Sequence, residues 1–347
     1  ADDASDEEEP QAATQGVDTV TLGAAGAPGA SHANTLEDAL DKVNDGGTIE
    51  VLPGSNISFS GVMITKNVTL KSQSGTQTLR QSAGEDAYTL AVSGCTVTLD
   101  NIILDADGNE HGSIVWVEAD GTLVMRNAAT LRNKDLKYYS GVTGGAGIYN
   151  LGTVTMYSGS RIENCKINSG SFSGSGGGAY NKGTMLIDES SIINCGAIST
   201  GGGIYNLGDL TINNGEIRNC TLTGDGSFIL GAGIYLTTYD RDTGEHTGKP
   251  RLTMNGGTIA GCTGGVGTGI YVYSTAVVLL QGNVIIGETP GDNILYTRST
   301  VPIQLIGPLA ASARINCESS ISFTDEVIVQ PDPDKYPTMT SQDYDAF

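Results

Sequence analysis

Histidine, charged residues and metal-binding cysteine pairs are all scarce in this sequence. Among its 347 residues only 16% are charged, and three are histidines, His32, His111 and His246, none of them beside a plausible nucleophile. No Cys-x-x-Cys pair occurs, which argues against a zinc site. No Gly-x-x-x-x-Gly-Lys-Ser/Thr phosphate loop occurs either. Ser/His/Asp and Cys/His catalysis therefore find no support in the sequence.

Positive charge and long apolar runs are scarce as well. The chain has 18 Lys and Arg against 39 Asp and Glu, which gives a formal net charge of −21. So acidic a chain should avoid nucleic acid and anionic membrane surfaces, although it can attract cations such as Ca²⁺. Because no run of about 18 apolar residues is present, the sequence predicts no transmembrane helix.

Composition divides the chain into four parts. Residues 1–16 are acidic and lack core residues, so we expect a disordered tail of the kind that remains after export and cleavage. Residues 17–47 contain a strand-like segment and an amphipathic helix, with Asn34 or Thr35 as its N-cap, that we expect to cap the following structure. Residues 48–330 consist of short alternating segments separated by turns, and 331–347 are expected to be a linker or frayed end.

Glycine is abundant, with 49 residues, and much of it belongs to a repeat. Three copies join a Gly-x-Tyr-Asn step to an x-Ile-x-Asn-Cys step, and looser copies begin at Gly231 and Gly269. The three clear copies span 145–165, 177–195 and 202–220. The spacing from Tyr to Cys is nearly constant, whereas the spacing from Tyr to Tyr varies, so each coil has a fixed scaffold and loops that absorb insertions.

The repeat predicts an all-β fold: a single-stranded, right-handed parallel β-helix of about ten coils with an N-terminal capping helix. Apolar residues that recur at fixed repeat positions should face inward and form continuous columns. The predicted columns are Val154, Met185, Leu210 and Leu252; Met156, Ile187, Ile212 and Met254; and Ile162, Ile192, Ile217 and Ile259.

Asparagine and cysteine also recur with the repeat. Asn164, Asn194 and Asn219 should lie at a bend, where their amides hydrogen-bond along the stack, and Gly261 interrupts that ladder. One cysteine per copy favours stacked, buried free thiols over disulfides. These four are Cys165, Cys195, Cys220 and Cys262.

With these motifs in place, the chain resembles known β-helix families over about residues 35–310. The Gly-Gly-Ile-Tyr-Asn and Ile-x-Asn-Cys steps resemble the repeats of polymorphic outer-membrane proteins. Residues 282–309 resemble surface β-helix proteins of Gram-positive gut bacteria, through their Gly-Asn, Asp-Asn-Ile-Leu-Tyr and Ile-x-Leu-x-Gly-x-Leu segments. The predicted helix and the segment 48–54 that follows it resemble the cap of pectate-lyase-like folds. The resemblance implies export and an adhesin-like role. The chain lacks the Phe-x-x-Asn motif of the outer-membrane family, and it lacks a Leu-Pro-x-Thr-Gly sorting signal.

The tyrosine column is the first candidate site. Alternation places the preceding Ile or Ala inward, so the tyrosines should point outward. Exposed rings along a rod could bind a glycan or peptide through their flat faces. The alternative, which we favour, is an aromatic ladder that stabilises neighbouring coils and is partly covered by loops. The candidate ligand-binding residues are Tyr149, Tyr180, Tyr205, Tyr235 and Tyr271.

The insertion at 237–250 is the second candidate, because it is the richest cluster of titratable groups. Its candidate catalytic residues are Asp240, Asp242, Glu245 and His246. Paired carboxylates could hydrolyse a glycosidic bond, and Lys249 or Arg251 beside acids could serve a calcium-assisted lyase. The alternative that we favour is a solvated hairpin loop.

The segment 105–111 is the third candidate, since Asp-Ala-Asp-Gly-Asn-Glu-His is similar to a calcium loop. Its glycine comes two places early, and the twelfth position is Trp116 instead of an acid. We interpret it as a turn and expect no metal and no cofactor.

These observations favour a monomeric, extracellular or bacterial cell-surface module that binds a glycan or an extracellular protein through its flanks and its variable loops. Those loops are 133–143, 166–176, 221–230 and 237–250. The alternatives are a polysaccharide-active enzyme, either lyase or glycoside hydrolase, and a structural stalk. An enzyme needs acids, or an acid with Arg or Lys, converging in a groove; a binding module needs exposed tyrosines; a stalk needs neither.

Overall fold

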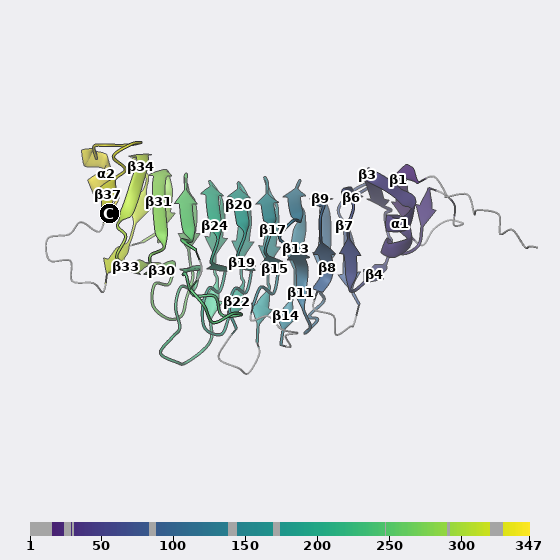
Figure 1. Cartoon of the computed structure of the whole chain (residues 1–347), viewed down its shortest axis with the longest axis horizontal. Helices are drawn as coiled ribbons and strands as arrows, with labels where there is room; N and C mark the ends of the chain where they lie inside the picture. Colours follow the sequence, from purple (N-terminus) through teal and green to yellow (C-terminus); the bar gives the residue numbers. More distant parts are fainter. Residues whose placement is uncertain are drawn as a thin grey trace, which may run out of the picture.

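The computed structural model describes residues 16–23, 29, 31–82, 88–137, 144–168, 174–246, 248–289, 292–319 and 329–347. Across these residues the chain is an all-β solenoid of about ten turns, in which each strand pairs in parallel with the strand one coil away. Figure 1 shows the strands side by side along the long axis, with long loops projecting from one side. The described part contains two short helices, α1 (Leu36–Lys42) and α2 (Ser341–Asp345).

Three long sheets and one short sheet form the faces of the coil. The first sheet contains, in spatial order, β2 (His32–Ala33), β1 (Val17–Leu22), β3 (Val43–Val51), β6 (Val68–Ser72), β9 (Thr96–Asp100), β12 (Thr122–Arg126), β16 (Thr153–Met156), β20 (Thr184–Asp188), β24 (Asp209–Asn213), β28 (Arg251–Met254), β31 (Val277–Gly282), β34 (Ile303–Leu309) and β37 (Val329–Pro331). The second contains β4 (Ile57–Phe59), β7 (Gln77–Gln81), β10 (Ile102–Asp105), β13 (Thr130–Arg132), β17 (Arg161–Glu163), β21 (Ser191–Ile193), β25 (Glu216–Arg218), β29 (Gly257–Ala260), β32 (Val284–Ile286) and β35 (Arg314–Ile315). The third contains β5 (Val62–Ile64), β8 (Tyr88–Val92), β11 (Ser113–Val117), β15 (Ile148–Asn150), β19 (Ala179–Asn181), β23 (Ile204–Asn206), β27 (Ile234–Leu236), β30 (Ile270–Ser274), β33 (Leu295–Ser299) and β36 (Cys317–Ser319). The short sheet contains β14 (Asp135–Leu136), β18 (Lys166–Ile167), β22 (Gly196–Ala197) and β26 (Thr221–Leu222).

The predicted inward columns are confirmed in register and in burial. Val154 pairs with Met185, Met185 with Leu210, and Leu210 with Leu252. All twelve residues of the three predicted columns are buried and belong to one hydrophobic core. Since each inward side chain contacts its equivalent one coil away, the repeat buries a continuous core that no single coil could bury alone.

The predicted asparagine bend is confirmed in its backbone. Asn164, Asn194 and Asn219 have φ values of 54°, 54° and 55°, in the left-handed region that asparagine tolerates better than most residues. Gly261 takes over this bend with φ of 64°, and a Cβ there would lie 2.3 Å from Asn219 Oδ1, which gives a steric reason for glycine. The predicted amide hydrogen bonds among Asn164, Asn194 and Asn219 are not observed in the described residues; Asn164 Nδ2 instead donates to Asn133 Oδ1 at 3.4 Å, a residue that the prediction did not include.

A second asparagine ladder, which the sequence interpretation missed, lies inside the coil. Asn150 Nδ2 donates to Asn181 Oδ1 at 2.6 Å, and Asn181 Nδ2 donates to Asn206 Oδ1 at 2.6 Å. All three side chains are fully buried. The amides satisfy one another along the stack, which removes the cost of burying them. The sequence does contain a pattern that could have predicted this ladder, because each of the three clear copies places Asn directly after Tyr.

The cysteine prediction is confirmed. Cys165, Cys195, Cys220 and Cys262 are buried free thiols. Their sulfurs lie against backbone carbonyls of their own and neighbouring coils. Burial, followed by the contact with Cys165, raises the pKa of the Cys195 thiol well above its ordinary value, and the contact with Cys262, followed by burial, does the same for Cys220. These thiols therefore pack as small apolar side chains.

The prediction from sequence was correct for the helix near the N-terminus but not for the C-terminal segment. Helix α1 occurs where expected: Thr35 is its N-cap and accepts a hydrogen bond from the Asp38 amide. The segment 331–347, expected to be a linker or frayed end, instead carries α2 against β34. The Asp343 carboxylate is fully buried and accepts hydrogen bonds from the Leu309 amide and the Tyr336 hydroxyl, which fixes this segment in place. Of the expected 1–16 tail, only Gly16 lies in the described residues.

No helix in the described part of the chain is long and apolar enough to cross a membrane.

Candidate functional site

A column of aromatic residues runs along the outer face of the third sheet. Backbone pairing places Trp116, Tyr149, Tyr180, Tyr205, Tyr235, Tyr271 and Tyr296 in register on successive coils. Ring centroids are 4.3 Å apart for Trp116–Tyr149 and 4.6 Å apart for Tyr180–Tyr205. The largest centroid separation along the column is 5.7 Å, between Tyr235 and Tyr271. The rings form a hydrophobic cluster distinct from the core inside the coil, so they face outward as predicted.

The expected exposure of these tyrosines is wrong. Tyr180 and Tyr205 have no accessible surface, and the other three candidates, Tyr149, Tyr235 and Tyr271, are buried too. The favoured alternative, a ladder that packs between coils beneath a loop, describes what the structure shows. Tyr149, Tyr180 and Tyr205 therefore have no free face to offer a ligand.

The cover over these three rings is the insertion 237–250, which we call the arm. It is a hairpin, closed by a bridge between Tyr239 and His246 and by the Asp240 amide donating to the Glu245 carbonyl. The favoured interpretation, a solvated hairpin loop, is correct for the exposed residues 243–246, but Asp240 and Asp242 are turned back onto the stack. The hydroxyls of the column bind it: Tyr149 donates to Asp242, Tyr180 donates to Asp240 at 3.3 Å, and Tyr205 donates to the Tyr239 carbonyl at 2.6 Å.

Lys182 is the centre of the contact between the arm and the coil. Its Nζ lies 3.1 Å from an Asp240 carboxylate oxygen and 2.6 Å from an Asp242 carboxylate oxygen. It also lies 5.5 Å from the ring centroids of both Tyr149 and Tyr180. All three charged side chains are largely buried. One cation thus pairs with two carboxylates over an aromatic surface, so the triad keeps a net charge of −1 and each member depends on the others.

The electrostatics of the covered rings follow from this burial. Desolvation raises the pKa of Tyr149, Tyr180 and Tyr205 far above that of a free tyrosine. The Asp240 and Asp242 carboxylates add to the shift of Tyr149 and Tyr180, and Tyr235 and Asp240 add to that of Tyr205. Burial raises the pKa of Tyr235, the next ring, to about 12. These hydroxyls are neutral donors over the ordinary pH range, so they bind carboxylates and do not act as bases.

The four catalytic candidates do not share one open site. Asp240 and Asp242 converge, but they do so on Lys182 beneath the arm. Glu245 is exposed at the tip of the hairpin, and His246 lies at the groove edge with Nδ1 2.8 Å from the Thr238 hydroxyl. Asp209 and Arg251 lie on adjacent coils and are paired in register in the first sheet.

The calcium-like segment is held by cations of the chain itself. The Asp105 carboxylate accepts hydrogen bonds from Arg132 at 2.8 Å and Asn133 at 3.1 Å. Lys134 is buried and donates to the Gln81 and Asn109 side chains and to the His111 carbonyl. Burial lowers the pKa of Lys134 to about 7. Within the described residues, no group of three or more His, Cys, Asp or Glu could hold a metal ion.

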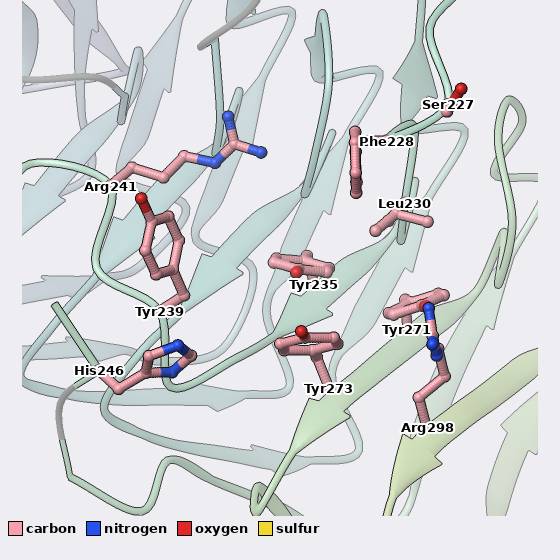
Figure 2. A pocket seen from close by; sticks show the side chains of 10 residues that line it. All are labelled: Ser227, Phe228, Leu230, Tyr235, Tyr239, Arg241, His246, Tyr271, Tyr273 and Arg298. Carbon is pink, nitrogen blue, oxygen red and sulfur yellow. The ribbon is translucent and has the colours of Figure 1, made fainter. Parts of the chain in front are cut away.

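Beyond the arm the aromatic column opens into a groove of about 390 Å³. Figure 2 shows its side chains, which come from the 221–230 loop, the arm, β27, β30 and β33. The lining residues are Ser227, Phe228, Leu230, Tyr235, Tyr239, Arg241, His246, Tyr271, Tyr273 and Arg298. A second hollow of about 440 Å³ shares Ser227, Phe228, Tyr239 and Arg241 with it, so the two are continuous.

The groove offers aromatic rings to solvent, which the covered half of the column does not. Phe228 is 74% exposed, Tyr239 is 38% exposed, and Tyr273 is half-buried. Single exposed aromatic residues are ordinary on a protein surface, but several gathered around one groove are typical of a binding site. Of the five predicted tyrosines, Tyr235 and Tyr271 lie in the groove and the other three do not.

No family model matches the chain, and no curated protein or solved structure is significantly similar to it.

The sequence interpretation named the loop 221–230 and the arm as variable loops but missed Phe228, Arg241, Tyr273 and Arg298 as groove residues. Each occurs once and not in every copy, so no repeat signal singles it out. Tyr273 and Arg298 come together because β30 and β33 pair in register at these two residues. The groove can therefore present flat ring faces and guanidinium donors to one ligand, a combination that suits a sugar ring with polar substituents.

Proposed function

We propose that this chain is an extracellular, adhesin-like module that binds a glycan in the groove beyond the arm. The observation that carries the proposal is the set of aromatic side chains, Phe228, Tyr235, Tyr239, Tyr271 and Tyr273, that line one solvent-open groove together with polar groups. Flat aromatic faces pack against the apolar face of a sugar ring, while hydroxyl and guanidinium groups bind its hydroxyls. The module acts as a monomer in this proposal.

Location and architecture belong to the same proposal. The resemblance to surface β-helix proteins supports a cell-surface location, and a right-handed, pectate-lyase-like coil fits the short strands and the parallel sheets. Helix α1 would cap the N-terminal end, because its buried Leu36, Ala39 and Leu40 join the core there. A protein ligand in place of a glycan is an outcome of the test below.

The test is a glycan array followed by titration calorimetry on the best ligand. Tyr273→Ala and Phe228→Ala should each weaken binding at least about tenfold, which corresponds to about 1.4 kcal/mol. Tyr157→Ala is the matched control, because Tyr157 is an exposed tyrosine that does not line the groove. Binding that survives both groove variants, or an array without a ligand, would overturn the glycan-binding proposal. An array without a ligand beside capture of an extracellular protein would favour the protein-binding alternative.

A lyase is the second candidate, favoured by one specific observation. The Tyr239 and His246 rings lie 5.4 Å apart beside Arg241, in the same groove as Arg298. In an elimination, a base removes the proton next to a uronate carboxylate, the bond to the leaving oxygen breaks, and that oxygen takes up a proton, while guanidinium groups neutralise the carboxylate. Unsaturated products from uronate polysaccharides, absent with His246→Ala, would support this candidate. A hydrolase is less well supported, because Asp240 and Asp242 face Lys182 and not the groove.

A further inference from the structure

The groove is positively charged on a strongly negative protein. The chain carries a net charge of −21, yet none of the ten described residues that line the groove is acidic, and two of them are arginines. The acids that flank Arg241 in sequence, Asp240 and Asp242, are turned toward Lys182 and form ion pairs with it. Neither Arg241 nor Arg298 forms an ion pair with an acidic residue of the described part of the chain, so the groove keeps two guanidinium groups for an anion that most of the surface would repel.

The two arginines lie on opposite sides of the groove. Figure 2 shows Arg241 on the arm side and Arg298 on the opposite side, with the rings of Tyr235 and Tyr273 between them. Arg298 is exposed on β33 and lies against the Tyr271 hydroxyl, which accounts for its raised pKa. A bound ring packed on the aromatic side chains would have a guanidinium within reach at either edge.

Arg241 also has an unused donor. Its backbone amide donates to the Tyr180 hydroxyl at 3.3 Å, and its guanidinium carbon lies 5.9 Å from the Tyr205 ring centroid. Its Nε is buried and has no hydrogen-bond partner among the described residues. A buried donor without a partner costs free energy, and because Nε is buried, a ligand acceptor would recover that cost only if the Arg241 side chain moved to expose it.

We infer that the groove selects anionic saccharides, whose carboxylate or sulfate group is bound by Arg298 and Arg241. This rests on the proposed glycan-binding function and narrows its ligand class. Arginine suits this role because its planar fork donates two parallel hydrogen bonds to a carboxylate or a sulfate. The sugar ring supplies the apolar face for the aromatic residues, and the anionic group supplies the charge.

The experiment compares three probes that share one core: lactose, 3′-sialyllactose and 3′-sulfolactose. Calorimetry on the full chain at low salt should give at least about tenfold tighter binding for one or both anionic probes than for lactose. Added salt should shrink this difference, because the exposed Arg298 is screened. Preference for the sialylated or the sulfated probe would identify the anionic group.

Variants complete the test. Arg298→Gln should weaken the binding of 3′-sialyllactose and 3′-sulfolactose much more than the binding of lactose, so that most of the anionic preference is lost, and Arg241→Gln should act in the same direction. Arg161→Gln is the control, since Arg161 is exposed but does not line the groove. Thermal melting of each variant checks that the fold is intact.

The outcomes separate the two proposals. Equal binding of all three probes would overturn the anionic preference and leave glycan binding standing. Absence of binding by all three, together with an empty array, would overturn glycan binding and the anionic preference with it. An anionic preference that persists in the double variant R241Q/R298Q would show that other residues carry it and would also overturn the assignment.

Discussion

The two halves of the aromatic column have the same backbone pairing and are both buried, but one half lies beneath the arm and the other lines the groove. Tyr149, Tyr180 and Tyr205 lie nearly parallel beneath the arm, with interplanar angles of 10° and 7°. From Tyr205 onward the rings tilt, by 44° to Tyr235 and by 30° from Tyr235 to Tyr271, and the groove opens beside them. One repeated residue thus serves as packing in one half and as part of a candidate binding surface in the other.

The difference between the halves comes from loops and not from the coil. The arm supplies Asp240, Asp242 and the Tyr239 carbonyl as acceptors for the covered hydroxyls. At the open half, the 221–230 loop brings Phe228 and the following coils bring Tyr273 and Arg298. A solenoid tolerates such insertions because each loop leaves the inward columns unchanged. The coil therefore sets the spacing of the rings, and the loops decide which rings a ligand can reach.

The largest expected effect is from Tyr180→Ala in the covered half. Removing a fully buried aromatic ring leaves a cavity between two stacked neighbours, so we expect a loss of about 3–5 kcal/mol in the free energy of unfolding. Tyr296→Ala, at the partly exposed end of the column, should cost clearly less. Urea denaturation of both variants measures the difference. Equal losses would mean that the arm does not distinguish the two halves.

Lys182→Met comes next, because it leaves Asp240 and Asp242 buried beside each other without a cation. Breaking such a triad costs about 3 kcal/mol, and we expect the arm to detach before the coil unfolds. Limited trypsin digestion should then cleave after Arg241 faster than in the unaltered protein.

The triple variant K182M/D240N/D242N is the matched control for this prediction. It removes all three charges, so it should recover much of the lost protection. Unchanged trypsin cleavage in Lys182→Met would mean that the aromatic contacts alone hold the arm.

A smaller effect that distinguishes the two halves is the dependence of the free energy of unfolding on alkaline pH. The pKa of Tyr149, Tyr180 and Tyr205 is raised in the folded state, so their contribution to stability is fully present below pH 10 and is lost as the unfolded chain ionises above it. At pH 10.5 the three together should cost about 2 kcal/mol. Replacing all three with Phe should flatten this decline in urea denaturation. A decline of unchanged slope in that variant would place its origin elsewhere.

The smallest expected effect on stability is at the open half. Phe228→Ala removes a side chain that is 74% exposed, so the free energy of unfolding should change by no more than about 0.5 kcal/mol. The same variant should lose glycan binding as described above, so it affects binding and not stability, whereas Tyr180→Ala mainly affects stability. A loss of more than 2 kcal/mol in thermal or urea denaturation would show that Phe228 packs as core.

Much of the coil could be predicted from the sequence. Inward residues recur with the repeat, and the register of Val154, Met185 and Leu210 follows from aligning the copies. The bend at Asn194 and the burial of Cys195 follow in the same way. Position in the repeat fixes what each of these residues contacts, because its neighbour is its own equivalent one coil away.

The candidate site could be predicted only in part. The tyrosine column and the arm were both recognised, but their contact was not, and neither was the role of Lys182 between them. Lys182 occurs in one copy alone, so the repeat gives no reason to select it. The C-terminal helix was missed for a similar reason, since one buried carboxylate, Asp343, holds it in place.

The sequence by itself determined the parallel coil, its inward columns, its bends and the outward direction of the aromatic column, because these depend on contacts between equivalent positions. Only the tertiary structure decided which tyrosines are covered and which line the groove. That outcome depends on contacts between residues far apart in the chain and unrelated by the repeat, such as Tyr149 with Asp242, which are separated by 93 positions. Alternation tells which way a side chain points, but a loop from a distant coil decides what lies above it.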